Sequence, residues 1–415
     1  MSQEPNRATT PQCRVHTRRR SSYGHPVSEE LNFDEGRERR ALRAAVGDLG
    51  AKYGQRYFLD QARSGGNTDE LWAEAGKLGF LGVNLPEEYG GGGGGLGELA
   101  LVLEELGAAG CPLLMMIVSP AICGTVLAKF GTDEQKTRWL PGLADGSATM
   151  AFAITEPDAG SNSHNITTVA RRDGDRWRLT GRKIWISGID LADHVLVVAK
   201  LADGPKGTLR PALFVVPTDA PGLEAHPIPT EIVSPERQFS VFLDDVALPA
   251  DALIGHPDAG IAQLFAGLNP ERVMAAAYAV GVSRLAMSKA TEYARTRSVW
   301  STPIGAHQGL AFPLAACQVE IELAALMTQK AAWLIDQGQD EAAGAAANTA
   351  KYAAAEAAAH TVDQAIQTHG GNALSQEYGV AALLAMSRVS RIAPVSREMI
   401  LSFIAQHRLK LPRSY

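Results

Sequence analysis

The segment from residue 151 to residue 187 combines residue types that could hold a flat ligand. A β-like run leads into a polar turn of small residues at 155–161 (TEPDAGS), and a hairpin signal, Asp173-Gly174, precedes a strand that ends in KIWIS at 183–187. Hydroxyls, exposed backbone amides and one tryptophan therefore gather at the ends of neighbouring strands. Such a set suits a flat heteroaromatic ring with hydrogen-bonding edges, and we predict its binding site here.

Residues further along the chain have the types that bind phosphate. Arg297 lies in the segment YARTRSVWS, and Gln308 follows it eleven residues later. Arginine binds a diphosphate as a charged fork. Gln367 comes shortly before Gly370 and Gly371, and consecutive glycines let a backbone approach a ligand without obstruction by Cβ. The alternatives are a solvated arginine at a helix end and an ordinary glycine helix cap.

Glu271 has a side chain that can transfer protons, and it follows a pattern that starts a helix. Asn269 is a good helix N-cap and Pro270 a good first helical residue, so the sequence predicts that Glu271 lies in the first turn of a helix. A carboxylate in a dry pocket suits this task because burial raises its pKa toward the working range. The alternative is a glutamate that only complements the helix dipole, worth about 0.3–1 kcal/mol.

These motifs, in this order and spacing, resemble the acyl-CoA dehydrogenase family. The resemblance covers nearly everything after residue 27 and implies an α+β multidomain fold. This fold has an N-terminal helical domain, a middle β-barrel or sandwich domain and a C-terminal four-helix bundle. It also implies FAD-dependent α,β-dehydrogenation of an acyl-CoA thioester, in which a base removes the α-proton while hydride leaves the β-carbon for flavin N5. Electrons are then expected to pass to an electron-transfer flavoprotein.

The resemblance also implies individual site residues. Those expected to hold FAD are Phe152, Ile154, Thr155, Gly160, Ser161, Trp185, Ile186, Ser187, Arg297, Val299, His307, Gln308, Gln367, Gly370, Gly371, Ser396 and Glu398. Those expected to contact substrate are Ser161, Asn269, Arg272 and Val395. In the family the glycine turn reaches the FAD of the neighbouring subunit, which implies a homodimer or homotetramer.

The position of the base departs from the commonest family pattern. Many members place the catalytic glutamate in a Tyr-Glu-Gly-Thr turn near the C-terminus, where this chain has Pro394, which cannot take a proton. Isovaleryl- and long-chain-type members instead place it at the start of the first C-terminal helix, which matches Glu271. Glu398 is a weaker candidate for the base. Proline also lacks an N–H, so either Val395 polarises the thioester carbonyl or this site is weaker, by roughly 100-fold.

The chain divides into a leader and three compositional blocks. We predict a disordered leader at 1–27, a helical domain at 28–149, a β domain at 150–257 and a helical bundle at 258–415. The glycine tract at 90–95 has no GxxxxGK[ST] pattern, and it predicts a flexible connection between helices rather than a phosphate loop. The uncharged run at 107–128 contains two prolines, which favours buried helices over a membrane span.

Composition excludes several other classes of protein. The net charge of −6 has no basic run in the folded part, which argues against nucleic acid as a partner. Four cysteines without CxxC spacing predict reduced thiols, with Cys111, Cys123 and Cys317 as core residues. We predict no metal site, because four scattered histidines lack ligand spacing: His164, His194, His226 and His256.

Some alternatives stay open at this level. The arginines and serines of the leader are compatible with an organellar transit peptide, although a cytoplasmic, bacterial-type enzyme is the main expectation. A flavin monooxygenase or oxidase of the same fold, and a non-catalytic partner subunit, are the competing functions. A base on the helix favours branched, long or ring-bearing acyl groups, by analogy only.

Overall fold

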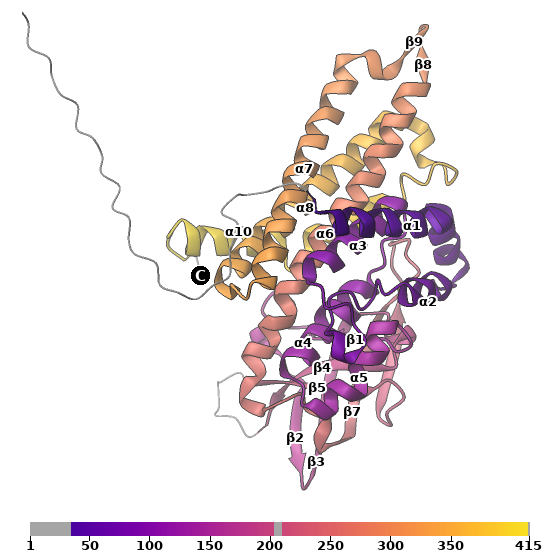
Figure 1. The fold of residues 1–415 in the computed structure, drawn as a ribbon. Coiled ribbons are helices and arrows are strands. Elements are labelled where there is room, and N and C mark those ends of the chain that lie inside the picture. The colour runs from indigo at the N-terminus through magenta and orange to yellow at the C-terminus, as the bar shows by residue number, and fades with distance from the viewer. Residues whose placement is uncertain (1–34, 203–209, 414–415) are drawn as a thin grey trace, which may run out of the picture.

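A computed structural model describes residues 35–202 and 210–413 of the chain, so the predicted leader lies outside the described residues. Figure 1 shows helices first, then a sheet, then a second set of helices that runs far beyond the sheet. The first set comprises α1 (Arg37–Ser64), α2 (Asp69–Lys77), α3 (Leu96–Ala109), α4 (Thr125–Phe130) and α5 (Asp133–Asp145). The short helices are η1 (Glu87–Tyr89), η2 (Ile117–Gly124), η3 (Ser163–Asn165), η4 (Ile189–Leu191), η5 (Ala250–Ala252), η6 (Pro257–Ala259), η7 (Ile304–Ala306), η8 (Gly370–Leu374) and η9 (Ile404–Arg408).

Helix α3 is the central helix of the first set. It is buried along most of its length and packs against α1 and α6. The uncharged run that follows it forms two short helices, η2 and α4, and nearly all of it is buried as predicted. Helix η2 packs against strand β1 and against helix α6, so it lies between the sheet and the C-terminal helices.

The glycine tract at 90–95 is not the flexible connection that the sequence predicts. Among its backbone hydrogen bonds, three of 2.9 Å reach residues 82–85: from the Gly92 amide to the Gly82 carbonyl, from Gly93 to Leu85 and from Gly94 to Val83. A Cβ on Gly91 would lie 2.2 Å from the carbonyl oxygen of Leu85. The glycines therefore permit close packing of two backbone segments, which composition alone cannot distinguish from a loose linker.

The middle of the chain forms a mixed seven-stranded sheet. Its strands are β1 (Met150–Ala153), β2 (Val169–Asp173), β3 (Arg176–Ser187), β4 (His194–Leu201), β5 (Pro211–Pro217), β6 (Leu223–Ile228) and β7 (Gln238–Pro249). The order is β1-β4-β2-β3-β7-β6, with β5 on β4; the β4 pairs with β1 and β2 are parallel and the rest antiparallel. The predicted β2–β3 hairpin forms with Gly174 at a φ of 61°, the left-handed turn conformation that glycine favours.

Both faces of the central strands are buried, but in different cores. On β4, Val195 and Val197 face an inner core formed by the sheet itself, while Leu196 and Val198 join the large core shared with the helices. This explains why β4 and β5 are nearly continuous apolar runs rather than alternating patterns. The expectation of a small barrel or sandwich is confirmed, and its helix-facing side supports the site.

The C-terminal helices form the predicted bundle. They are α6 (Gly260–Thr296), α7 (Gln308–Asp336), α8 (Asp340–His369), α9 (Leu383–Ile392) and α10 (Arg397–Phe403), with a small hairpin of β8 (Ser298–Val299) and β9 (Thr302–Pro303) between α6 and α7. Alanines fill the buried faces of α8, which lets α6, α7 and α8 pack closely. Figure 1 shows the β8–β9 hairpin at the end of the bundle furthest from the sheet.

The predicted start of the first C-terminal helix is wrong. Helix α6 begins at Gly260, so Asn269 and Pro270 are interior residues rather than the N-cap and first residue. Tertiary contacts extend the helix toward its N-terminus. A Cβ on Gly260 would lie 1.6 Å from the Pro211 carbonyl, and the Gln263 side chain donates to the Ile254 carbonyl at 2.7 Å. Local cap signals could not reveal these contacts.

Helix α7 has one apolar face that no part of residues 35–202 or 210–413 covers. Among the described residues it is the one helix long and apolar enough to cross a membrane by those two criteria, with a mean hydropathy of 1.6. It packs against α8, α6 and α3 on its other side. The uncovered face is defined by exposed side chains at helical spacing, Phe312, Val319, Leu323, Leu326 and Trp333. We call it the α7 stripe.

Candidate active site

Trp185 lies at an interruption of the β3–β7 ladder. The register shifts between Lys183 and Ile186, so the intervening residues leave the regular pairing, and the Ile184 amide instead donates to the Thr155 carbonyl at 3.0 Å. Trp185 has a φ of 61°, a conformation rare for a bulky residue. Its side chain is 53% exposed. It is therefore not a core aromatic, and its ring is available to a ligand.

A buried ion pair anchors the polar turn beside this tryptophan. Lys183 Nζ donates to Glu156 at 2.9 Å and to the Ile154 carbonyl at 3.0 Å, and both charged side chains are almost fully buried. Glu156 also accepts backbone N–H bonds from Thr167 and Thr168. Burial raises the pKa of Glu156, but the Lys183 charge and these hydrogen bonds bring that pKa down to about 2. The sequence analysis did not single out this pair.

The other predicted ring-binding residues lie close to this anchor. Phe152 is near the end of β1, and Ser187 ends β3, where its hydroxyl donates to Gln238 Oε1 at 3.1 Å. Ile186 is buried and holds the strand against the inner core. Gly160 and Ser161 lie in the exposed part of the turn. The Lys183–Ile154 and Ile184–Thr155 hydrogen bonds thus hold the last part of β3 next to the turn that follows β1.

Glu271 lies on α6, near strand β1. Cys123 of η2 connects the two: its thiol lies 3.5 Å from the Ala151 carbonyl on β1, and the Glu271 charge adds to the effect of burial in raising the thiol pKa. The carboxylate of Glu271 accepts no hydrogen bond from any described residue. Burial raises the pKa of Glu271 to about 7, although the charges of Arg272 and Lys351 oppose the shift.

The two neighbouring cations are directed to other acceptors. Arg272 donates to Asn348 Oδ1 at 2.9 Å and to the Leu268 carbonyl at 3.2 Å. Lys351 donates to the Val395 carbonyl, and burial lowers its pKa to about 8. Glu271 thus has positive charge nearby but no direct ion pair. Nothing in the sequence pattern pointed to Lys351 or Asn348, which lie within an alanine-rich helix.

The loop before α10 lies beside the same lysine. Val395, a predicted substrate contact, is joined to this region through Lys351. Ser396 caps α10, with its hydroxyl accepting the Met399 amide at 3.2 Å. Glu398 is exposed and pairs with Arg397 at 3.1 Å, so it has none of the burial that a base in a dry pocket needs. Asn269, another predicted substrate contact, faces Gly344 on α8.

Glu236 is another buried glutamate, and it lies near the end of β3. Glu236 accepts the Met115 amide at 3.0 Å, and a Cβ on Gly188 would lie 2.4 Å from the Met115 sulfur. Burial raises the pKa of Glu236 to about 7, as for Glu271, but backbone amides already occupy its oxygens. Sequence analysis missed it because a glutamate after Ser-Pro gives no signal of burial.

The remaining predicted FAD residues lie at the other end of α6. Arg297 directly follows this helix, Val299 is in the β8–β9 hairpin, and His307 and Gln308 begin α7; all four are exposed. Two hydrogen bonds hold the backbone of Arg297 in place: its amide donates to the Tyr293 carbonyl at 2.9 Å, and its carbonyl accepts the Ile304 amide at 2.8 Å. The Arg297 side chain takes no part in these two bonds.

The glycine turn reaches the same end of the bundle. Gln367, Gly370 and Gly371 are exposed at the C-terminus of α8. Next to them the His369 ring stacks on the Tyr293 ring of α6, with 4.4 Å between the ring centroids. The Asn372 side chain donates to the Tyr293 hydroxyl at 3.0 Å. Gly370 has a φ of 58° and a ψ of −137°, which only glycine adopts freely, and a Cβ at Gly371 would meet open space.

Most of the predicted FAD residues therefore form two groups. The sheet group comprises Phe152, Ile154, Thr155, Gly160, Ser161, Trp185, Ile186 and Ser187. The tip group comprises Arg297, Val299, His307, Gln308, Gln367, Gly370 and Gly371. Ser396 and Glu398 lie apart from both, at the start of α10. Glu271 is near the sheet group, and 26 residues of the same helix separate it from Arg297. At 1.5 Å per residue this is about 39 Å along the axis. The structure brings each group together, but it does not bring the two groups together within one chain.

Three family models match consecutive parts of the chain. They are the acyl-CoA dehydrogenase N-terminal domain at residues 36–147, the middle domain at 151–246 and the C-terminal domain at 258–409. The chain belongs to the acyl-CoA dehydrogenase family. It resembles acyl-CoA dehydrogenase FadE12 of Mycobacterium tuberculosis (strain ATCC 25618 / H37Rv), with 67% identity over 93% of this chain and 100% of the relative. The predicted family, the fold and the class of enzyme are thereby confirmed.

Solved structures of relatives agree. A glutaryl-coenzyme A dehydrogenase in complex with glutaryl-CoA has a TM-score of 0.88 and 27% identity, covering 92% of this chain and 98% of that one. A glutaryl-CoA dehydrogenase from Mycobacterium smegmatis in complex with FADH2 has a TM-score of 0.84 and 27% identity, covering 92% and 96%. The prediction of FAD as cofactor is confirmed at the level of the family by such complexes.

Proposed function

We propose that this acyl-CoA dehydrogenase desaturates an acyl-CoA thioester between its α and β carbons, with Glu271 as the base that removes the α-proton. One observation carries the proposal: Glu271 is a carboxyl group with a pKa raised to about 7 by burial and with no hydrogen-bond donor among the described residues. A base tuned to the working pH can take a proton and later release it. FAD, when bound, accepts the hydride that leaves the β-carbon.

The residues of this chain would fit such a cofactor at the sheet group. Trp185 offers an exposed ring in a strained backbone conformation, and the Glu156–Lys183 pair holds the turn that carries Thr155. Phe152 and Ile186 are buried and support this part of the sheet. Thr155 and Ser187 add hydroxyls. These residues would hold and orient the ring, and Glu271 would take the proton from a substrate bound beside it.

The positive charges near Glu271 also have a role in this proposal. Arg272 and Lys351 favour the ionised base, which keeps its pKa close to neutrality instead of higher. Because Asn348 and Val395 accept their hydrogen bonds, neither cation occupies the proton-accepting oxygens. Asn269, Arg272, Ser161 and Val395 are the proposed substrate contacts. Pro394 cannot donate an N–H to the thioester carbonyl, so that task falls to Val395 or is weaker.

The decisive experiment replaces the carboxylate alone. Glu271→Gln should bind FAD and acyl-CoA but reduce the flavin roughly 10²–10⁴-fold more slowly, measured as anaerobic bleaching of the flavin band. Glu236→Gln is the matched control, a buried carboxyl of similar pKa whose oxygens are already bonded, and it should lose less than about tenfold. Bleaching retained by Glu271→Gln would contradict the assignment. Rapid oxygen uptake by the reduced wild-type enzyme would favour the oxidase alternative.

We propose further that the site is completed by a second copy of this chain. The tip group carries the arginine suited to a diphosphate, yet about 39 Å of helix separates it from Glu271. The α7 stripe supplies an uncovered apolar surface for a homodimer or homotetramer. The tip group of one chain would then serve the sheet group of another.

Hybrid enzymes test the shared site. Co-expressed Glu271→Gln and Arg297→Glu chains with different tags should form a hybrid that regains about half of the wild-type activity per dimer, while each variant alone stays inactive. The reason is that one site of the hybrid combines an intact Glu271 with an intact Arg297. If both residues served the same site within one chain, the hybrid would have no intact site and would be inactive.

The remaining assignments complete the proposal. An electron-transfer flavoprotein is the proposed electron acceptor, and the cytoplasm is the proposed location, because the most similar relative named above is bacterial. The helix position of the base leads us to propose branched, long or ring-bearing acyl groups. A panel of acyl-CoA thioesters with an artificial electron acceptor measures that preference, and the highest kcat/KM on short straight chains would contradict it.

A further inference from the structure

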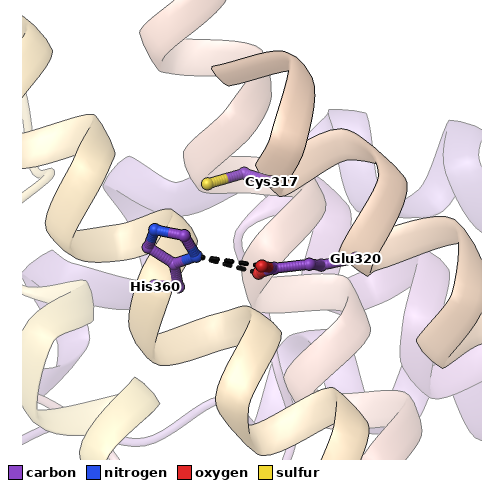
Figure 2. Close-up of side chains that lie close together, drawn as sticks. All are labelled: Cys317, Glu320 and His360. Atoms are coloured by element: carbon purple, nitrogen blue, oxygen red, sulfur yellow. Dashed lines mark hydrogen bonds and ion pairs between the residues drawn. The ribbon is translucent and has the colours of Figure 1, made fainter. Parts of the chain in front are cut away.

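Three side chains of metal-ligating type meet where α7 packs on α8. Figure 2 shows Cys317 and Glu320 of α7 and His360 of α8 directed toward one another. One sulfur, one carboxylate oxygen and one imidazole nitrogen lie within 4.8 Å of one another. Cys317 and Glu320 are three residues apart and so share a face of the helix. We propose that these residues form a binding site for one Zn²⁺ ion that joins α7 to α8.

The donor set matches this ion. Zn²⁺ accepts sulfur, nitrogen and oxygen ligands together, at about 2.0–2.3 Å in tetrahedral geometry. Ligand atoms around such an ion lie about 3.5 Å apart, so small side-chain rotations suffice to close the site. A cysteine thiolate and a glutamate carboxylate also balance the two positive charges of the ion. Binding would release the thiol proton to solvent as the sulfur–zinc bond forms.

Thr361 gives an independent indication. Its side chain is fully buried beside Cys317, and its hydroxyl has no nitrogen or oxygen partner within the described parts of the chain, so the Cys317 sulfur is the acceptor that it approaches. A neutral thiol is a weak acceptor, and a buried hydroxyl with only a weak partner is costly. Burial raises the pKa of the Cys317 thiol, and the Thr361 hydroxyl acts in the opposite direction. A metal-bound thiolate would accept the hydrogen bond that Thr361 has available, as outer partners of metal ligands commonly donate.

Two of the three proposed ligands, Glu320 and His360, are exposed to solvent. The side chains of Glu320 and His360 are 43% and 48% exposed, so an ion can enter from solvent and a water molecule can complete the tetrahedron. A plain surface contact between His360 and Glu320, at 2.9 Å, would account for those two residues and contribute little stability. It would not account for the buried sulfur of Cys317 or for the buried Thr361 hydroxyl beside it.

None of the three proposed ligands is among the residues proposed for the dehydrogenase site, so the test of the metal site is independent. Metal-free holoenzyme is titrated with Zn²⁺ by calorimetry, and Co²⁺ is used as a spectroscopic probe of the thiolate. We expect one Zn²⁺ per chain and a thiolate-to-cobalt charge-transfer band. Cys317→Ser and His360→Gln should each lose more than about 100-fold in affinity, because changes in outer partners alone cost about 10–100-fold.

Matched variants refine the result. Thr361→Val keeps the shape and removes the hydroxyl, and it should weaken binding about 10–100-fold. Glu322→Gln, on the same helix but turned toward Gln318, should bind as the wild type does. FAD content and flavin bleaching should stay unchanged in His360→Gln, which separates this proposal from the dehydrogenase proposal. Equal Zn²⁺ binding by the wild type and Cys317→Ser, or no thiolate band with Co²⁺, would overturn the site.

Discussion

The buried Glu156 and the partly buried Glu271 differ strongly in pKa, although each has a buried lysine nearby. The pKa of Glu156 lies at about 2 and that of Glu271 at about 7. Lys183 points at Glu156 from 2.9 Å, whereas Lys351 points away from Glu271 to the Val395 carbonyl. Proximity of a cation is thus not sufficient. Direct hydrogen bonds to the carboxylate decide whether burial produces an anchor or a base.

The comparison also separates stability from function. Glu156 is ionised in the folded protein at every ordinary pH, and its ion pair fixes the turn of the sheet group. Glu271 is held in a place where ionisation is costly. This is the arrangement expected of a working residue, because a proton acceptor that is fully bonded to donors has no strong tendency to take a proton. Functional residues in natural proteins often lower the stability of the fold for this reason.

The largest expected effect breaks the anchor. Glu156→Gln or Lys183→Met leaves one buried charge without its partner, and such losses cost about 3–5 kcal/mol. We expect the Tm to fall by roughly 3–6 °C for a chain of this size, together with weaker flavin retention, measured by circular dichroism and flavin fluorescence. Asp245→Asn, which removes an exposed pair with Arg178, is the control and should cost under about 1 kcal/mol. Equal shifts in both variants would refute the anchor role.

Replacing Glu271 should change the stability of the fold less than replacing Glu156 does, and in the opposite direction. Its folded pKa of about 7 exceeds the ordinary value of 4.5, so the folded state binds more protons between those pH values and loses stability as pH rises through them. Glu271→Gln should therefore be more stable than the wild type by about 1–3 kcal/mol at pH 8, and by little at pH 5. Thermal unfolding of both proteins at the two pH values measures this.

Glu156 provides the contrasting pH dependence. Its folded pKa of about 2 lies below 4.5, so its contribution to stability is present above pH 4.5 and is lost as pH falls toward 2. Acid unfolding of the wild type should therefore begin in that window, and Glu156→Gln should lack this limb. A gain at pH 8 for Glu156→Gln instead of Glu271→Gln would reverse the assignment of the two roles.

The smallest expected effect concerns Lys351. Its charge lowers the pKa of Glu271, so Lys351→Met should move the limb of kcat/KM against pH, expected near pH 7 because the base must be ionised, to higher pH by about one unit. Lys289→Met is a matched control, since that lysine also donates to a backbone carbonyl, of Tyr378, at 3.0 Å. A limb that does not move in Lys351→Met would show that this charge does not act on the base.

Much of the site was predictable where local sequence pattern carries it. The turn at 155–161, the hairpin at Gly174 and the strand ending in Trp185 lie next to one another in sequence, and the sheet keeps them together. Glu271 was also predictable as the base candidate, but its helix begins at Gly260, because contacts with residues far away in the sequence outweigh the Asn269-Pro270 signal. The glycine tract was misread as flexible for the same reason.

The sequence by itself determined the order of domains, the family and the residue types available for chemistry, because periodicity, turn residues and motif spacing are local properties. Only the tertiary structure decided which carboxylate is bonded and which is not, since Lys183 and Lys351 reach their acceptors across 27 and 44 residues of chain. It also decided that Glu271 lies inside α6, well before the end of the helix that Arg297 follows. Burial and long-range hydrogen bonds set proton affinity, and neither can be obtained from spacing alone.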